Sequence, residues 1–100
     1  CLDLRKNSKT FGKIFKIILS EDNCKSLLIP KGFAHGFCGL GQKNVLLYMN
    51  SDIRNPEEEY GIAWNDMNLK IKWPLKKMII SKKDKNNLSF LDFKKKIKYL

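Results

Sequence analysis

In the stretch NLKIKWP, residues 68–74, apolar and charged side chains alternate from Leu69 to Trp73. A period of two residues is typical of a β-strand that has one buried face and one face in water. Pro74 ends the stretch, because proline has no N–H group to donate to a sheet. The stretch therefore predicts a half-exposed strand near a sheet edge and favours a β-rich fold.

Several other short segments also have the composition of strands. They are rich in β-branched and aromatic residues and are separated by residues that favour turns. Together they predict an all-β sandwich or barrel made of many short strands. The segments are FGKIFKIIL at 11–19, SLLIP at 26–30, AHGFCGL at 34–40, NVLLYMN at 44–50 and KKMIIS at 76–81.

The C-terminal tail has a different period. Apolar residues recur at Phe90, Phe93, Ile97 and Leu100, which is the spacing of one face of a helix. Ser89, followed three residues later by an aspartate, resembles a capping box. A short amphipathic helix is therefore expected at the end of the chain, with the lysines at 94–96 on its solvated face.

The chain has 100 residues, which suits one small domain, and its net charge is +10. No run of 18 apolar residues predicts a membrane span, and no signal peptide is visible. The charge favours an anionic partner or reflects a simple bias toward lysine. The second explanation is preferred, because the chain has 18 lysines and only two arginines, Arg5 and Arg54, whereas phosphate and base recognition favours arginine.

Cysteine usage indicates a reducing, cytoplasmic setting. Cys1, Cys24 and Cys38 are odd in number and form no CxxC pair, so neither a disulfide framework nor a zinc site is predicted. The sequence begins at Cys1 and enters directly on LDLR, residues 2–5, which resembles the middle of a strand. We therefore expect it to be a fragment of a longer protein.

Four features could carry chemistry, and each also has a purely structural explanation. His35 is either a functional polar contact or a core histidine bonded to backbone. Tyr48 is either a proton donor, protonated at neutral pH, or an aromatic residue with its hydroxyl at the surface. The acidic run in NPEEEYG, residues 55–61, either binds a ligand or is a solvated turn. SKKD, residues 81–84, either places Asp84 beside a histidine or forms a polar turn.

Metal and serine-nucleophile chemistry find little support. A single histidine is too few for a site that needs several His and Glu ligands. No GxSxG motif is present for nucleophilic hydrolysis. We predict no metal and no cofactor.

The order of the motifs is more informative than any one of them. DLRKNSKTFGK, LSEDN, LLIPKGFAHGF, VLLYMNSD, NPEEEYGIAWND, IKWP and SKKD follow one another along the chain. The most specific are IPKGFAHGF with a tyrosine thirteen residues after its histidine, and the series GIAWND, WP and SKKD. Together they resemble the C-terminal half of the dTDP-4-dehydrorhamnose 3,5-epimerase family, from Leu2 to about Leu91.

The resemblance implies a fold and a reaction. It implies an all-β, cupin-like jelly roll with a short C-terminal helix, of which residues 1–100 are the C-terminal part of a single domain. It implies a homodimer when full length and a metal-free enzyme of dTDP-L-rhamnose biosynthesis, with no nucleic-acid or membrane partner. The substrate would be a dTDP-4-keto-6-deoxy sugar, whose C3 and C5 are inverted by proton removal beside the C4 ketone and reprotonation from the opposite face.

The resemblance also implies roles for particular residues. Tyr48 matches the proton donor, and Asp84 matches the aspartate that pairs with the catalytic base. His35, Glu59 and Lys83 match substrate-binding positions. In the family the base is a histidine of an RGLH-like segment, followed by a lysine that stabilises the enolate, and both come before the point where this sequence starts. We therefore expect the 100-residue chain alone to be inactive.

Two departures and three alternatives accompany this interpretation. Arg54 stands where the family usually has an aromatic residue, and Lys9 stands where proline is usual. The chain could instead be a non-catalytic remnant that binds sugar nucleotides, or a relative that epimerises only C3 or only C5. A basic nucleic-acid-binding module is disfavoured, because the lysines are scattered and the aromatic residues lie in apolar segments.

Overall fold

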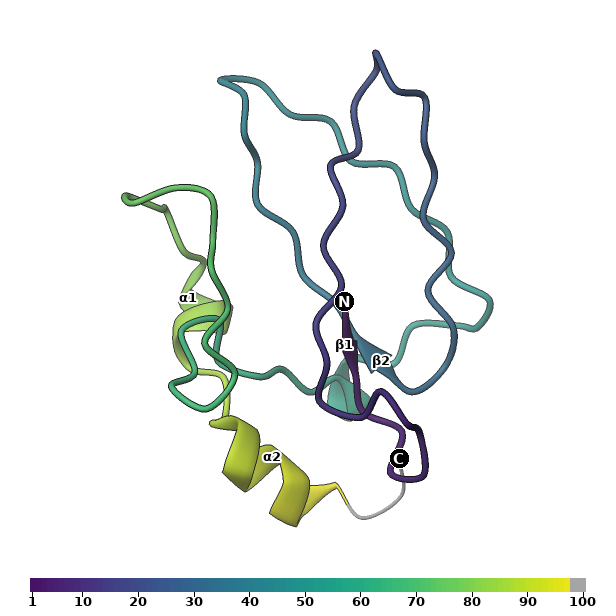
Figure 1. Cartoon of the computed structure of the whole chain (residues 1–100), viewed down its shortest axis with the longest axis vertical. Coiled ribbons are helices and arrows are strands. Elements are labelled where there is room, and N and C mark those ends of the chain that lie inside the picture. Colours follow the sequence, from purple (N-terminus) through teal and green to yellow (C-terminus); the bar gives the residue numbers. More distant parts are fainter. Residues whose placement is uncertain (98–100) are drawn as a thin grey trace.

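The computed structural model describes residues 1–97 and is mostly non-helical, with a two-stranded sheet and short helices (Figure 1). The two strands pair antiparallel, with Leu2 opposite Ala34 and Asp3 opposite Phe33. This agrees with the predicted all-β class at a coarse level. The elements in chain order are β1 (Leu2–Asp3), β2 (Phe33–Ala34), the 3-10 helix η1 (Pro56–Glu58), α1 (Lys82–Lys85) and α2 (Phe90–Lys96).

The central pairing joins the N-terminus to two later segments. β1 lies within the stretch expected to be the middle of a strand, and Leu2 also forms an isolated bridge with Ile14. Asp3 N–H donates to Lys13 O at 3.1 Å, and Leu4 N–H donates to Gly32 O at 2.9 Å. The first residues of the chain therefore lie between the segment near residue 14 and β2.

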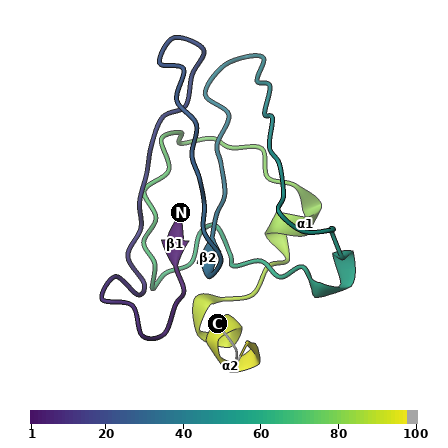
Figure 2. The same cartoon turned by 90° about the vertical axis from the view of Figure 1, so that its right-hand side faces the viewer.

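Most of the other predicted strands are wrong as paired strands within residues 1–97. Single residues of two segments do pair: Ala34, at the start of 34–40, lies in β2, and Ile14, within 11–19, bridges Leu2. The chain between β1 and η1 runs out and back in long excursions that point away from α2 (Figures 1 and 2). Within the described residues, the named strands are β1 and β2 alone. A strand needs a hydrogen-bonded neighbour in register, and the apolar spacing of these segments supplies none by itself. Val45, Leu47 and Met49 on one excursion are about nine-tenths exposed.

The stretch 68–74 keeps its predicted alternation without forming a strand. Its apolar side chains are half-buried and its two lysines are exposed, as the pattern predicts. However, Lys70 has a φ of 49°, in the left-handed region, and its N–H donates to Asp66 O. The Asp66 carboxylate also accepts the N–H groups of Asn68 and Leu69. The first half of the stretch is therefore a turn around a buried aspartate.

The predicted C-terminal helix is confirmed as α2. Ser89 Oγ accepts the Asp92 N–H at 3.1 Å and donates to the Asp92 carboxylate at 2.6 Å, which makes the expected cap. Phe90 and Phe93 are buried on one face, and the lysines at 94–96 are exposed on the other. Ile97 is the C-cap rather than a residue of the helix. Leu100, predicted for the same apolar face, lies outside the described residues.

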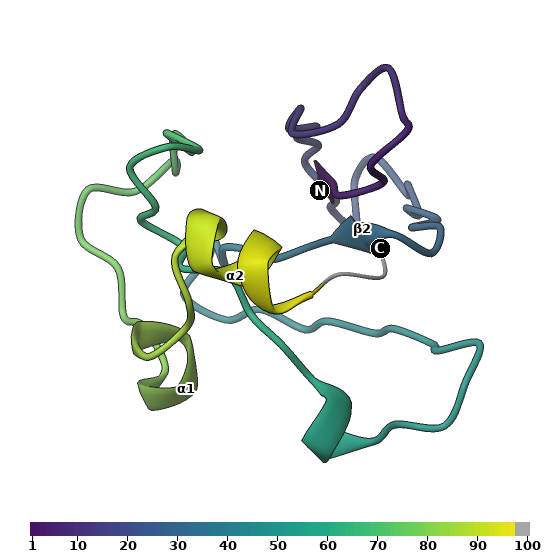
Figure 3. The ribbon, with the colours of Figure 1, turned by 90° about the horizontal axis from the view of Figure 1, so that it is seen from below.

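The small core sits where α2 packs against the N-terminus. Its buried apolar members are Leu2, Leu4, Phe90 and Phe93. Seen from below, α2 lies to the left of β2 (Figure 3). The partly buried residues that pack around this core are Ile14, Ala34, Ile62, Leu69, Leu88 and Ile97. None of the helices among residues 1–97 is long and apolar enough to cross a membrane.

Helix α1 is an element that the sequence analysis missed. The SKKD segment was expected to be a polar turn or a histidine partner, but it begins a short helix. Ser81 Oγ accepts the Asp84 N–H at 3.0 Å, the same arrangement as at the start of α2. The shared Ser-x-x-Asp pattern is the signal that could have predicted it.

Candidate functional site

Glu59 joins two segments that are far apart in the sequence. Its carboxylate accepts from the Arg54 guanidinium through both Nε and Nη2, the latter at 3.2 Å. It also accepts from Lys83 Nζ at 2.7 Å, 24 residues along the chain. Two residues that sequence analysis assigned to substrate binding, Glu59 and Lys83, are thus in direct contact.

Local structure explains why these side chains meet. Asn55 caps η1 by accepting the Glu57 N–H at 3.2 Å, and Pro56 occupies the first turn, where its missing N–H costs nothing. Glu59 follows as the C-cap of η1, and its N–H donates to Pro56 O. On the other side, the Ser81 cap starts α1 and so directs Lys83 toward Glu59. Two short, capped elements therefore support the contact.

The cluster has strong internal electrostatics. Its two cations, Arg54 first and then Lys83, lower the pKa of Glu59 to about 2. In return, Glu59 raises the pKa of Arg54 through its hydrogen bonds and its negative charge, and burial opposes this. We call Arg54, Glu59 and Lys83 the Glu59 cluster.

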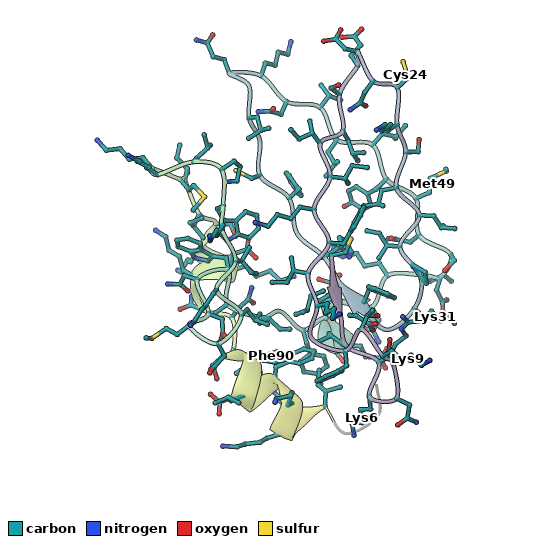
Figure 4. All side chains as sticks on the ribbon, in the orientation of Figure 1. Lys6, Lys9, Cys24, Lys31, Met49 and Phe90 are labelled. Atoms are coloured by element: carbon teal, nitrogen blue, oxygen red, sulfur yellow. The ribbon has the colours of Figure 1, made fainter. Side chains whose placement is uncertain are left out.

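Tyr48 is freely accessible in this structure. Its side chain is 72% exposed, and its hydroxyl makes no hydrogen bond within residues 1–97. It lies in an excursion in which every residue from 41 to 50 is exposed. Figure 4 shows the neighbouring Met49 pointing away from the body of the molecule. The phenol is thus available to a ligand.

Asp84 lies one residue after Lys83 and is part of the α1 cap. Its Oδ2 accepts from Ser81 Oγ at 2.8 Å, and its Oδ1 accepts from the Asn87 amide at 3.3 Å. The chain's one histidine does not contact it: no hydrogen bond or ion pair joins Asp84 to His35 in the described part of the chain. The carboxylate is nevertheless on the same short helix as the Glu59 partner Lys83.

His35 lies directly after β2 and is exposed. The adjacent Gly36 approaches the ring of Trp73, since a Cβ atom at Gly36 would lie 3.7 Å from Trp73 Cη2. Trp73 is itself held by a hydrogen bond from Nε1 to Trp64 O at 2.8 Å. The backbone that follows His35 thus passes close to a fixed tryptophan, but no hydrogen bond among residues 1–97 links His35 to the Glu59 cluster.

Sequence analysis missed Asp3, the most deeply buried polar side chain described. Its carboxylate accepts from Arg5, Ser8 and Thr10 at 2.6–3.0 Å, and it is 2% exposed. The Arg5 guanidinium is the main reason that the pKa of Asp3 is well below its usual range; burial opposes this, and the two hydroxyls reinforce it. Arg5 also stacks over Phe33 at 4.6 Å. The pattern D-x-R-x-x-S-x-T was the available signal.

Asp66 was missed as well and has a structural role. It is 7% exposed, and its Oδ2 accepts the Phe90 N–H at 2.7 Å, which ties the turn at 66–70 to the start of α2. Burial raises the pKa of Asp66, and three backbone N–H groups, those of Phe90, Leu69 and Asn68, outweigh it, so that the pKa is lowered. A buried aspartate in WND is thus a cap and not a catalytic group.

Two further kinds of site were sought among residues 1–97. No group of three or more His, Cys, Asp or Glu side chains there is placed to hold a metal ion. A hollow of about 180 Å³ lies between the N-terminal loop and α2, and it contains none of the five predicted site residues. Its lining residues are Leu4, Lys6, Phe11, Phe93, Lys94 and Ile97.

Comparisons with known proteins give one consistent family. The family model described as dTDP-4-dehydrorhamnose 3,5-epimerase matches residues 1–92. The protein of that name from Shigella flexneri is 41% identical, in an alignment that covers 91% of this chain and 50% of the relative. The one from Pseudomonas aeruginosa is 44% identical, and the alignment covers 91% of this chain and 51% of the relative. A third, from Methanothermobacter thermautotrophicus, is 42% identical, and the alignment covers 85% of this chain and 48% of the relative. The chain thus spans about half the length of the curated relatives it matches. No solved structure gives a significant match.

Proposed function

The chain belongs to the dTDP-4-dehydrorhamnose 3,5-epimerase family, and on that premise we propose that the protein acts as a sugar-nucleotide epimerase of dTDP-L-rhamnose biosynthesis. Its substrate is a dTDP-4-keto-6-deoxy sugar. The observation that carries the proposal is the Glu59 cluster. It joins two residues predicted to bind substrate, Glu59 and Lys83.

The chemistry assigned to these residues follows from the ketone. The C4 carbonyl acidifies the hydrogens on C3 and C5, because the electron pair left by proton removal is delocalised into an enolate. A base removes the proton from one face, and Tyr48 donates its hydroxyl proton to the same carbon from the other face. The bond from carbon to hydrogen is broken on one side and remade on the other, and the configuration is inverted.

The remaining predicted residues have supporting roles in this proposal. Asp84 pairs with the base histidine and fixes its tautomer. His35, Glu59 and Lys83 bind the substrate. The base that the resemblance implies is a histidine of an RGLH-like segment, and the single histidine of these 100 residues, His35, is assigned to binding. The proposal therefore places the base outside them. A polypeptide of these 100 residues alone is therefore proposed to be inactive.

The finer structural predictions remain part of the proposal. We assign residues 1–100 to the C-terminal part of one cupin-like jelly-roll domain, with a homodimer as the working assembly. The exposed apolar residues of the excursions support this, since side chains such as Val45, Leu47 and Met49 are of the type that sheets bury. Free Cys1, Cys24 and Cys38 fit a reducing cytoplasm. Neither a nucleic acid nor a membrane is proposed as a partner.

The test is turnover of the keto-sugar nucleotide by the native protein in heavy water. Deuterium at both C3 and C5 of an inverted product, detected by NMR, is the expected result. Deuterium at one carbon only would assign the protein to the C3-only or C5-only relatives. Tight binding without any exchange would contradict the epimerase proposal and favour a non-catalytic binding protein. The same assay on residues 1–100 alone should show no product.

A further inference from the structure

Arg54 is held in one orientation by Glu59. Its Nε and Nη2 both donate to the Glu59 carboxylate, a two-point contact that fixes the plane of the guanidinium. Within residues 1–97, its Nη1 group makes no hydrogen bond. The side chain is 65% exposed. A fixed guanidinium edge with unused N–H donors is thus presented to solvent.

The charges of the Glu59 cluster do not cancel. Glu59 contributes one negative charge, and Arg54 and Lys83 contribute two positive charges. An isolated Arg54–Glu59 pair would be neutral, but Lys83 at 2.7 Å leaves the three side chains with a net charge of +1. Glu59 therefore orients Arg54 without removing its attraction for an anion.

From this arrangement we infer that Arg54 is a further substrate-binding residue that contacts the diphosphate of the sugar nucleotide. The inference rests on the proposed function, which supplies the substrate class. In such a substrate the diphosphate is bonded directly to the sugar ring. The diphosphate is also the anionic group of such a substrate, so the positive charge of a cluster that contains two residues predicted to bind substrate, Glu59 and Lys83, is expected to attract it. The planar N–H donors of arginine match phosphate oxygens in two-point contacts, which lysine does not reproduce.

The resemblance did not predict this role, since it leads to an aromatic residue at position 54. A guanidinium there brings a charge and hydrogen-bond donors that an aromatic ring lacks. Arg54 would accordingly shift part of the binding free energy from other parts of the nucleotide to the diphosphate. It is a specificity-determining residue rather than a catalytic residue.

Competition binding in the native protein tests the inference. The probes are thymidine, which has no phosphate, and thymidine diphosphate. Arg54→Gln is expected to weaken thymidine diphosphate about ten-fold, because one charged hydrogen-bonding group is lost, and to leave thymidine within about two-fold. The affinity of Arg54→Lys for thymidine diphosphate is expected to lie between those of the wild type and Arg54→Gln, because lysine keeps the charge and loses the planar donors. Lys25→Gln is the control, with the same charge change beside Cys24 at the far end of an excursion (Figure 4).

The outcomes separate the two proposals. Wild-type protein that neither epimerises the keto-sugar nor binds thymidine diphosphate would contradict the proposed function. Wild-type protein that turns over normally, while Arg54→Gln binds thymidine diphosphate unchanged, would overturn the role of Arg54 alone. An equal loss for thymidine and thymidine diphosphate would also overturn it, because the diphosphate would then not be the group recognised. Should Arg54→Gln fail to fold, as judged by circular dichroism, Arg54→Lys decides: full wild-type affinity would overturn the inference.

Discussion

Lys83 Nζ donates to the Glu59 carboxylate at 2.7 Å and so links helix α1 to the segment that follows η1. The two residues come from stretches that carry the family resemblance, NPEEEYG and SKKD, yet 24 residues separate them. Because Glu59 also holds Arg54, this single carboxylate connects α1 to the chain just beyond Tyr48. The relative position of Tyr48 and Asp84 therefore depends in part on Glu59.

The first prediction concerns the acidity of Glu59. Lys83→Met should raise the pKa of Glu59 from about 2 toward its ordinary value of 4.5, with Arg54 retaining part of the depression. Because the folded-state pKa is depressed, the stabilisation from this carboxylate is complete above its ordinary value and is lost as the pH falls toward 2. An NMR titration of the Glu59 carboxyl carbon measures the shift. Lys82→Met, on the same helix and without a contact to Glu59, is the control. An unchanged titration in Lys83→Met would show that the ion pair does not persist in solution.

The second prediction concerns Tyr48. Tyr48→Phe should reduce formation of the inverted product at least about hundred-fold, as expected for loss of a general acid. The base should still remove the substrate hydrogen, so the variant should exchange that hydrogen with heavy water while forming little inverted product. Substrate affinity should change little. Tyr60→Phe provides a control, since Tyr60 is an exposed tyrosine as well, at 52% against 72% for Tyr48. Normal product formation by Tyr48→Phe would remove Tyr48 from the proposed mechanism.

The third prediction concerns the buried Asp3 carboxylate. Asp3→Asn should lower the melting temperature at neutral pH, because Arg5, Ser8 and Thr10 lose a charged acceptor. The pKa of Asp3 is depressed in the folded state. Its stabilisation is therefore present above the ordinary aspartate pKa and declines as the pH falls below it. The variant should accordingly lose less stability than the wild type on acidification.

Thermal melting at pH 7 and pH 3 measures both effects of this substitution. Asp22→Asn, at an exposed turn, is the control and should melt like the wild type at both values. Equal acid sensitivity of Asp3→Asn and the wild type would assign the acid response to other carboxylates.

The fourth prediction concerns the small core. Phe93→Ala should lower the free energy of unfolding by about 3 kcal/mol, since the ring is 6% exposed and packs in the cluster with Leu2, Leu4 and Phe90. Leu91→Ala on the same helix removes a side chain that is 48% exposed and should cost less than about 1 kcal/mol. Urea denaturation measures both values. A similar cost for the two variants would mean that α2 does not pack through its predicted face.

Sequence patterns predicted the features that depend on neighbouring residues. Ser89 and Asp92 predicted the start of α2, because a cap is made within three residues of the chain. The alternation from Leu69 to Trp73 predicted which side chains are half-buried and which are exposed, although Asp66 bends the backbone there into a turn. The ordered motifs predicted the family, which the comparisons confirm.

Only the tertiary structure decided how distant side chains combine. Nothing local pairs Glu59 with Lys83 rather than with another of the 18 lysines, because that choice depends on where η1 and α1 lie in space. The sequence likewise placed a departure from the family at Arg54, but its orientation by Glu59 appears only once the chain is folded. The sequence by itself determined capping, burial pattern and family, which rest on short-range spacing. The fold decided the charged cluster, because a charge interacts with whatever lies near it in space.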